Sequence, residues 1–279
     1  MEILKYTAFS SDPGGGNPAG VVLDANGASD SDLLAVAAKV GFSETAFVVA
    51  KDERTLAVRY FSPLAEVPFC GHATIALAVA HADRHGAGRL ALDTKAGPIQ
   101  VTTTGSDGRT TATLVSVSPR TVPIADADRR ALLTALRWDE RDLDPALPVR
   151  VAYAGAWHPV VAAATRERLA DLDYDFDALG ALMADHDWTT IDLVWRESPS
   201  IVHARNPFPP GGVVEDPATG AAAAAFGGYL RELGLVDPPA RVVVHQGDDL
   251  GRPSLLTIDI PSDPASGIAV TGTAVPLPG

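Results

Sequence analysis

The chain has 279 residues and a formal net charge of −13, and 46% of its residues are hydrophobic. This length suits one large domain or two of about 140 residues each, and the apolar content is sufficient for a buried core. The negative charge argues against nucleic acid and anionic membranes as partners, whereas a small anionic ligand can still bind at helix ends.

The first residues lack the basic-then-apolar layout of a signal peptide, and no apolar stretch reaches the ~20 residues that span a bilayer. Cys70 is the single cysteine, which excludes an internal disulfide and leaves no thiolate cluster for a metal. The histidines are scattered singly. We therefore expect a cytoplasmic protein without a metal centre.

The first half alternates short strands with two helices. One helix is predicted to begin at Ser29 or Asp30 and to stop at Gly41, and a buried helix is predicted over Gly71–Arg84, ended by Gly86. The predicted strands are Glu2–Phe9, Ala19–Leu23, Glu44–Ala50, Thr55–Phe61, Leu90–Asp93, Ile99–Thr104 and Thr111–Val117.

The second half repeats this order after a predicted crossover at Ser118–Pro123. Its predicted helices are Asp126–Leu136, Phe176–Ala184 and Gly220–Leu233. Its predicted strands are Val149–Ala154, Val160–Thr165, Ile191–Arg196, Ile201–Ala204, Arg241–Gln246, Ser254–Ile260 and Ile268–Thr273.

Two offsets indicate an internal duplication. Helices that begin at Gly71 and Gly220 lie 149 residues apart, and the pairs Asn17-Pro18 and His158-Pro159 lie 141 residues apart. We expect an α+β fold of two pseudo-symmetric lobes, each a curled, mostly antiparallel β-layer wrapped around one apolar helix. The N-terminal lobe is predicted over residues 1–118, completed by a strand at 268–279, and the C-terminal lobe over residues 119–267.

Two polar segments directly precede the apolar helices. They are Phe69-Cys70-Gly71-His72-Ala73-Thr74 and Glu215-Asp216-Pro217-Ala218-Thr219-Gly220. A helix that begins this way directs unpaired N–H groups and its positive dipole end outward, which suits a carboxylate or phosphate. Two such segments suggest two related lobes that face one anionic ligand, and hence an enzyme.

Glu44 stands at the threshold of an apolar strand. A carboxyl group in apolar surroundings holds its proton more readily, which makes it a usable proton shuttle near neutral pH. The alternative is an exposed charge at the start of a strand.

His72 and Cys70 also have two interpretations each. His72 lies in the first turn of the predicted helix, where it would face a ligand. Alternatively, it caps the helix or is a partly buried histidine whose hydrogen bonds are satisfied. A thiol beside a helix N-terminus tends toward the thiolate and can act as a base, whereas a buried structural cysteine is the usual alternative.

Asp216 either faces the ligand as a second carboxylate or forms part of an acidic N-cap region with Glu215. The polar turn from Gln246 to Ser254 is, taken alone, an ordinary hairpin. No phosphate-binding loop, Gly-x-Ser-x-Gly or His-Glu-x-x-His motif is present.

Six motifs occur in one order over nearly the full length. They are Asn17-Pro18-Ala19-Gly20-Val21, Ser43-Glu44-Thr45-Ala46-Phe47, Phe61-Ser62-Pro63, Glu66 to Thr74, Glu215 to Gly220, and Gln246-Gly247 with Gly251-Arg252-Pro253-Ser254. With these motifs the chain resembles the PhzF-like (phenazine biosynthesis) isomerases of the diaminopimelate-epimerase-like fold.

The resemblance implies two lobes with the site in the cleft between them, a homodimer, and proton transfer without a cofactor. It implies Glu44 as the acid/base group, with His72 and Asp216 as polar partners. The residues implied in binding a small-molecule carboxylate substrate are Asn17, Ser43, Cys70, Gly71, Thr219, Gly220 and Ala221. The expected reaction is a double-bond shift in a conjugated, cyclic amino or hydroxy acid of secondary metabolism.

One difference from the racemases, which favours the isomerase, and two departures from the isomerase pattern bear on this reading. Racemases that resemble this fold use one cysteine per lobe, but here the second position is Thr219, whose hydroxyl is too weak an acid to replace a thiolate. Ala221 stands where this family commonly has Ser, and Arg205–Pro210 is richer in proline than the family norm. The alternatives are a Cys70-dependent epimerase or racemase and a non-catalytic binding protein.

Overall fold

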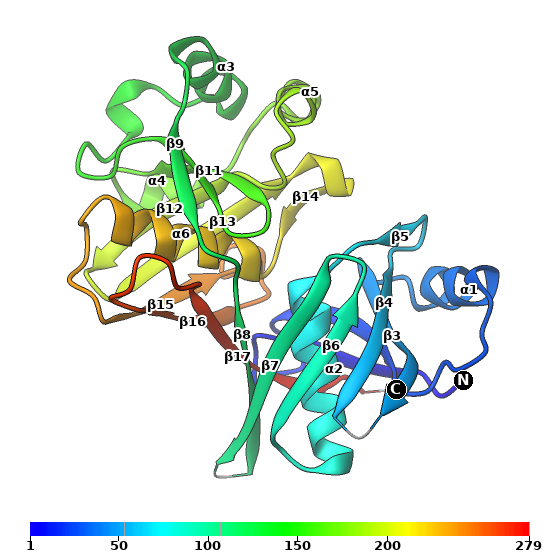
Figure 1. Cartoon of the computed structure of the whole chain (residues 1–279). Helices are drawn as coiled ribbons and strands as arrows, with labels where there is room; N and C mark the ends of the chain where they lie inside the picture. The colour runs from blue at the N-terminus through cyan, green and yellow to red at the C-terminus, as the bar shows by residue number, and fades with distance from the viewer. Residues whose placement is uncertain (53, 107, 279) are drawn as a thin grey trace. The chain divides into compact units, whose positions relative to one another are not determined.

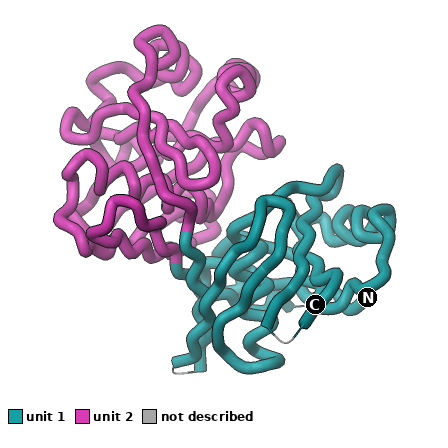
Figure 2. Tube along the Cα trace, viewed as in Figure 1, with its two compact units in different colours: residues 1–115, 271–279 teal, residues 116–270 magenta. Residues whose placement is uncertain are grey.

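The chain folds into two compact units (Figure 1; Figure 2). The computed structural model describes residues 1–52, 54–106 and 108–278. Unit 1 comprises Met1–Val115 and Thr271–Gly279, and unit 2 comprises Ser116–Val270. The predicted boundaries were residues 118 and 267, and Gly279, the end of the predicted C-terminal strand, lies outside the described residues.

Unit 1 is built on a closed ring of strands. They are β1 (Leu4–Ala8), β2 (Asn17–Val22), β3 (Glu44–Asp52), β4 (Thr55–Phe61), β5 (Glu66–Val67), β6 (Arg89–Thr94), β7 (Gly97–Ser106), β8 (Arg109–Val115) and β17 (Ala269–Pro276). Strands β2 and β3 pair parallel, as do β4 and β6, whereas β1–β2, β3–β4, β6–β7 and β7–β8 pair antiparallel. Strand β17 pairs with both β8 and β1, which closes the ring.

Helix α2 (Gly71–His85) contacts β1, β2, β3, β7 and β8 of this ring. Every residue from His72 to Ala80 is buried. A helix that is apolar on every face must be covered on every face, and the ring of strands does this. The small alanine side chains allow the strands to approach closely.

Helix α1 (Asp30–Val40) covers unit 1 from outside. Ser29 forms a capping box with Asp32, and Gly41 ends the helix in the left-handed conformation at φ 73°. The apolar side of α1 packs against Phe47 and Phe61. The predicted start and stop of this helix are confirmed.

Unit 2 repeats the strand pairings of unit 1. Its strands are β9 (Arg120–Pro123), β10 (Arg150–Tyr153), β11 (Trp157–Ala162), β12 (Asp192–Ser198), β13 (Ile201–Phe208), β14 (Val213–Asp216), β15 (Ala240–Gln246) and β16 (Ser254–Ile260). The parallel pairs β11–β12 and β13–β15 correspond to β2–β3 and β4–β6, and the hairpin β13–β14 corresponds to β4–β5. The shared pairing order supports the predicted duplication.

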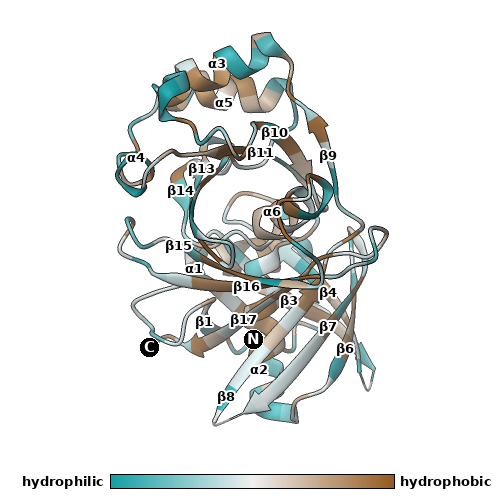
Figure 3. Cartoon of the chain, turned by 90° about the vertical axis from the view of Figure 1, so that its left-hand side faces the viewer, coloured by the Kyte–Doolittle hydropathy of each residue, from teal (hydrophilic) through white to brown (hydrophobic). Residues whose placement is uncertain are grey.

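Helix α6 (Gly220–Glu232) is enclosed by the strands of unit 2, as Figure 3 shows from the side. Residues Ala222 to Leu230 are all buried. A Cβ on Gly227 would lie 2.9 Å from Ile268, and one on Gly228 would lie 2.3 Å from Pro119. These glycines therefore allow neighbouring segments to touch the helix backbone.

Three helices cover the outer face of unit 2. They are α3 (Asp126–Leu136), α4 (Arg166–Ala170) and α5 (Phe176–Asp185). Leu132, Leu136, Leu179 and Met183 of α3 and α5 form an apolar cluster with Leu193 of β12. None of the helices in the described ranges is long and apolar enough to cross a bilayer.

Three sequence predictions differ from the structure. The predicted crossover at Ser118–Pro123 contains β9, which pairs antiparallel with β10. The Pro-rich segment continues β13 as far as Phe208 and returns through β14. Glu215 and Asp216 belong to this returning strand and not to a helix cap. Strand β9 is extended because it pairs with β10, about 30 residues away, whereas the end of β13 and β14 are extended because they pair with each other in a hairpin. Strand propensity alone does not encode such pairings.

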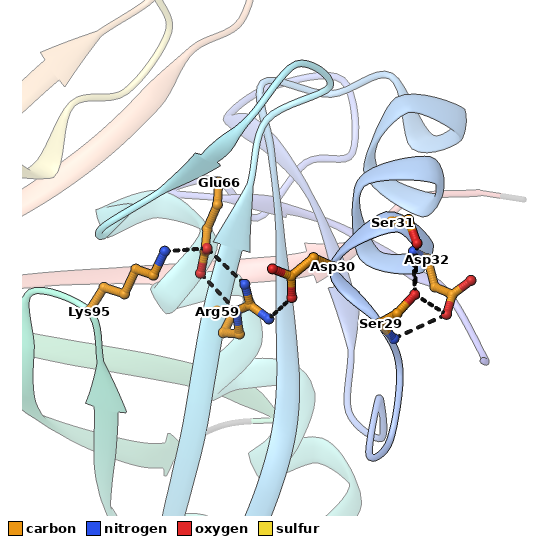
Figure 4. A network of polar contacts seen from close by, with 7 residues as sticks. All are labelled: Ser29, Asp30, Ser31, Asp32, Arg59, Glu66 and Lys95. Carbon is orange, nitrogen blue, oxygen red and sulfur yellow. Dashed lines mark hydrogen bonds and ion pairs between the residues drawn. The ribbon is translucent and has the colours of Figure 1, made fainter.

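A charged network braces the outer side of unit 1 (Figure 4). Arg59 of β4 donates to Asp30 at 2.6 Å and to both carboxylate oxygens of Glu66, at 2.7 and 2.8 Å. Lys95 forms a further ion pair with Glu66. Arg59 and Lys95 lower the pKa of Glu66 to about 2. The network thus ties α1, β4 and the turn after β6 to β5, which leads into α2.

Candidate active site

Three reactive side chains of unit 1 meet where β3 and α2 begin. Glu44 is the first residue of β3, and Cys70 and His72 flank the first residue of α2. The Cys70 thiol lies 3.5 Å from Glu44 Oε2, to which it donates, and His72 Nε2 lies 3.5 Å from the same oxygen. Cys70 Sγ and His72 Nδ1 are 3.4 Å apart. The Glu44 side chain is only 17% exposed, so it is not a solvated strand-start charge.

Asn17 and Ser43 hold the His72 ring. The Asn17 amide nitrogen lies 3.2 Å from Nδ1, and the Ser43 hydroxyl lies 3.4 Å from Nε2. An amide nitrogen only donates, so Nδ1 accepts and the proton of the neutral ring sits on Nε2. The ring N–H therefore faces Glu44 and Ser43. Both Asn17 and His72 are buried, whereas Ser43 is exposed.

The N-terminus of α2 is open beside Gly71. The Cys70 side chain does not cap the helix, and apart from the adjoining residues and the helix backbone, no heavy atom lies within 4 Å of where a Cβ on Gly71 would be. Behind the helix end, the Thr74 hydroxyl donates to the Cys70 carbonyl at 2.7 Å and pairs with the Tyr60 hydroxyl at 2.6 Å. The first-turn amides are thus held rigidly in a position that suits an anion.

Asp216 of unit 2 is part of a separate polar cluster. The Thr219 hydroxyl donates to Asp216 Oδ2 at 2.6 Å. The Gln246 amide nitrogen donates to the Asp216 carbonyl at 2.7 Å and to the Thr219 hydroxyl at 3.0 Å. The Thr219 N–H donates to Gln246 Oε1 at 3.0 Å. Asp216 and Thr219 are half-buried, and Gln246 is buried.

The neighbouring Glu215 has a structural role, which corrects the acidic N-cap interpretation. Its carboxylate is buried and pairs with both Nε, at 3.0 Å, and Nη2 of Arg205. Arg205 also donates to the Ala170 carbonyl at 2.6 Å. The pair corresponds to Arg59–Glu66 of unit 1. In both units an arginine on the long strand therefore clamps the short strand that leads into the apolar helix.

The predicted site residues fall into two groups. Unit 1 carries Asn17, Ser43, Glu44, Cys70, Gly71 and His72, and unit 2 carries Asp216, Thr219, Gly220 and Ala221. Within each group the residues adjoin one helix N-terminus. The joint action of the two groups on one substrate stays a prediction.

The analysis of the sequence missed a counterpart of Glu44 in unit 2. Glu44 pairs with Ala19, two residues after Asn17, and Asp192 pairs with Val160, two residues after His158. The register of the equivalent parallel strands therefore sets Asp192 where unit 1 has Glu44. The one sequence signal that could have indicated this is the equivalence of Asn17-Pro18 and His158-Pro159, which marks the two strands as counterparts.

Asp192 is fully buried and belongs to a chain of hydrogen bonds. Asn206 donates to Asp192 Oδ1 at 3.1 Å, Thr190 donates to Asn206 Oδ1 at 2.6 Å, and His158 Nδ1 lies 2.8 Å from the Thr190 hydroxyl. Burial raises the pKa of Asp192 to about 7 and lowers the pKa of His158 to about 4. Asp192 therefore keeps its proton below about pH 7, and His158 is neutral above about pH 4.

The unit 1 cluster is also the one group in the described residues with donor atoms suited to a metal. Glu44, Cys70 and His72 each offer one ligand atom, all within 4.8 Å of one another. A mixed carboxylate, thiol and imidazole set suits Zn²⁺, but the positive end of α2 favours an anion at the same point. The absence of a metal centre stays a prediction.

The chain is similar to phenazine biosynthesis-like proteins. The family model described as PhzC-PhzF, phenazine biosynthesis-like protein, matches residues 6–278. An uncharacterized isomerase of Bacillus subtilis is 31% identical over 284 residues, covering 98% of this chain and 96% of the relative. The trans-2,3-dihydro-3-hydroxyanthranilate isomerase of Pseudomonas chlororaphis is 31% identical over 255 residues, covering 89% and 86%.

Solved structures show the same fold. A Bacillus anthracis phenazine biosynthesis protein of the PhzF family superposes with a TM-score of 0.88 at 25% identity, covering 100% of this chain and 98% of that one. A probable proline racemase from Agrobacterium radiobacter superposes with a TM-score of 0.66 at 13% identity, covering 98% and 90%. The predicted α+β, diaminopimelate-epimerase-like fold is confirmed.

Proposed function

This chain belongs to the PhzC-PhzF family of phenazine biosynthesis-like proteins and is an isomerase, and from this premise we propose that it shifts a double bond within a small conjugated carboxylic acid. The proposed substrate is a cyclic amino or hydroxy acid of secondary metabolism. A relative at 31% identity is named for the isomerisation of trans-2,3-dihydro-3-hydroxyanthranilate, which makes this compound the first probe. Membership of an isomerase family leaves no reason to pursue the non-catalytic alternative.

Glu44 is the proposed acid/base group. Its carboxylate removes a proton from a carbon next to the conjugated system, and the electron pair of that C–H bond moves into the ring as the double bond shifts. The same carboxyl then gives the proton to another carbon on the same face. No electron is gained or lost, so the reaction needs no cofactor. A positioned acid/base of this kind contributes ~10²–10⁴-fold to the rate.

The observation that carries the proposal is the cluster of Glu44, Cys70 and His72 at the start of α2. The carboxylate lies 3.5 Å from both the thiol and the imidazole, in a partly buried position from which a proton can be exchanged. The amides of Gly71 and His72 would hold the substrate carboxylate and stabilise charge that develops during proton removal.

The remaining roles are part of the same proposal. Asp216 steers the amino or hydroxyl group of the substrate together with His72, and the amides of Gly220 and Ala221 bind the carboxylate. We also propose that the protein acts as a homodimer in the cytoplasm. Light scattering on the purified protein tests the dimer.

The second candidate is a Cys70-dependent epimerase, favoured by the contact between the thiol and Glu44. An epimerase needs a second acid for the opposite face of the carbon. The position that would supply it holds Thr219, whose hydroxyl already donates to Asp216. Retained turnover in Cys70→Ala rejects this candidate, whereas loss of turnover there with Glu44→Gln active would favour it.

Deuterium incorporation tests the proposal directly. The protein is incubated with trans-2,3-dihydro-3-hydroxyanthranilate, or another unsaturated cyclic amino acid, in D₂O, and the label is located by NMR. We expect incorporation by the parent protein and none by Glu44→Gln. Glu167→Gln, the same change at an exposed position of α4, is the matched control. A fully active Glu44→Gln protein would refute the assignment.

A further inference from the structure

The turn after β15 has no role in the reaction proposed above, although Gln246 and Gly247 were among the motifs of the sequence. Gln246 is 1% exposed, and its side chain forms hydrogen bonds with Asp216 and Thr219. Gly247 has φ +79°, and a Cβ there would lie 2.8 Å from the Pro217 carbonyl oxygen and 2.3 Å from that of Arg252. Only glycine allows this turn to press against the segment that carries Asp216.

The hydrogen bonds of Gln246 have a defined direction. Its Oε1 accepts the Thr219 N–H, so its amide nitrogen must face the other way and donate. One N–H goes to the Asp216 carbonyl and the other to the Thr219 hydroxyl oxygen. If the oxygen and nitrogen of the Gln246 amide were exchanged, its NH₂ group would face the Thr219 N–H, and its oxygen would face the Asp216 carbonyl oxygen. Neither pair can form a hydrogen bond.

These contacts leave the Thr219 hydroxyl one role, which is to donate its own hydrogen bond. Its oxygen already accepts from Gln246, so its proton is turned onto Asp216 Oδ2, 2.6 Å away. We propose that Gln246 is a positioning residue for Asp216, acting by directing the Thr219 hydroxyl onto that carboxylate. Its importance for turnover rests on the proposed function, in which Asp216 orients the substrate.

A hydroxyl that donates to a carboxylate stabilises its charged form. Removing the Thr219 hydroxyl, or the Gln246 amide that orients it, must therefore make Asp216 take up a proton at higher pH. This readout distinguishes positioning from a merely structural role, because a loss of stability alone does not move the titration of one carboxyl group.

The experiment follows the ¹³C signal of the Asp216 carboxyl by NMR across pH, identified by its loss in Asp216→Asn. In Thr219→Val, which removes only the hydroxyl, we expect the titration midpoint to rise by ~1 pH unit, the size of one hydrogen bond to a charge. Thr219→Ser should restore the parent midpoint. Gln246→Met, which removes the amide, should raise it as Thr219→Val does, and Gln100→Met, at an exposed position of β7, should not.

The double variant Gln246→Met/Thr219→Val tests whether Gln246 acts on Asp216 through the Thr219 hydroxyl. If Gln246 acts through the Thr219 hydroxyl, Gln246→Met adds nothing in the Thr219→Val background. Equal midpoints in the parent and Gln246→Met, or fully additive shifts in the double variant, overturn the proposal. If Gln246→Met does not fold, Gln246→Asn keeps a neutral amide but shortens the side chain by one methylene, which withdraws its donor from the Thr219 hydroxyl, and the same non-additivity is measured.

Kinetics link the inference to the reaction. We expect both Gln246→Met and Thr219→Val to lower kcat for the probe substrate more than they raise KM. If the parent protein incorporates no deuterium while the midpoints shift as expected, the proposed function fails and the positioning role stands. The reverse result leaves the function and removes the role of Gln246.

Discussion

The two units share one arrangement of strands, yet their equivalent carboxyl groups have opposite environments. Glu44 lies beside a thiol and an imidazole at the open end of α2, with part of its side chain exposed. Asp192, at the equivalent register, is fully buried, and burial raises its pKa to about 7. The backbone geometry created by a duplication therefore does not specify reactivity. The side chains that surround each carboxyl decide it.

The residues before the helices show the same divergence. Unit 1 has Cys70 and His72 where unit 2 has Thr219 and Ala221. The clamp that leads into each helix is common to both units, with Arg59–Glu66 in one and Arg205–Glu215 in the other. The clamp serves the fold that both units share, whereas the chemistry is distributed unequally.

The sharpest test of this comparison replaces each carboxyl group by its amide. Glu44→Gln should lower turnover by ~10²–10⁴-fold, because the proton carrier is lost. Asp192→Asn should leave turnover close to that of the parent, because Asn reproduces the neutral carboxyl of a structural network. Steady-state kinetics on the probe substrate measure both. Equal losses in the two variants would show that the units are not specialised in this way.

The two clamps should differ in their contribution to stability. Glu215→Gln leaves the buried Arg205 guanidinium unpaired, and we expect a loss of ~3–5 kcal/mol in the free energy of unfolding. Glu66→Gln affects a more exposed pair and should cost about 1 kcal/mol. Urea unfolding followed by circular dichroism compares them. A smaller loss for Glu215→Gln than for Glu66→Gln would contradict the ranking by burial.

The titration of Asp192 predicts a pH dependence of stability. An unfolded aspartate titrates near ~3.9, so between that pH and about 7 the native state holds an extra proton. The stability from this group is complete below ~pH 4 and is lost as pH rises to about 7. Asp192→Asn removes this loss and should be the more stable protein at pH 8, by roughly 2–4 kcal/mol.

Urea unfolding of the parent and Asp192→Asn at pH 5, 6, 7 and 8 measures the effect as the difference between the two stability profiles. The lowered pKa of His158, about 4, acts with the opposite sign, because it destabilises the native state as pH falls from ~6.5 to about 4. His158 is present in both proteins, so its contribution cancels in that difference. Parallel stability profiles for the parent and Asp192→Asn would show that Asp192 is ionised in the native state.

The smallest expected effect concerns the outermost member of the unit 1 network. Lys95 is 59% exposed and pairs with Glu66, which Arg59 already neutralises. Lys95→Met should change the free energy of unfolding by no more than ~0.5 kcal/mol, and added salt should remove the difference. A loss comparable with that of Glu215→Gln would show that exposure is a poor guide to these contributions.

The local sequence predicted most elements well. The helix Asp126–Leu136 and the strands Thr55–Phe61 and Ser254–Ile260 are confirmed at both ends, because periodicity and turn residues act locally. Strands β5, β9 and β14 were missed because they are only two to four residues long, too short for a clear alternation of polar and apolar residues. Strand β9 also pairs with a partner about 30 residues away.

The candidate site was predictable in part. Its reactive residues lie at helix and strand starts, where sequence signals are strongest, and Glu44, Cys70 and His72 do meet. The contact of Asp216 with Gln246 was not predictable, because Gln246 is 30 residues away and resembles any hairpin residue. Likewise, nothing local distinguishes the buried Asp192 from a solvated aspartate.

The sequence by itself determined the two apolar helices, the polar segments before them and the duplicated order of strands, since these follow from side-chain polarity and spacing. The tertiary structure decided which carboxyl group lies beside a thiol and an imidazole and which is fully buried in a hydrogen-bonded network. That choice depends on burial and on hydrogen-bond partners contributed by strands remote in the chain, and these exist only after the sheets have formed.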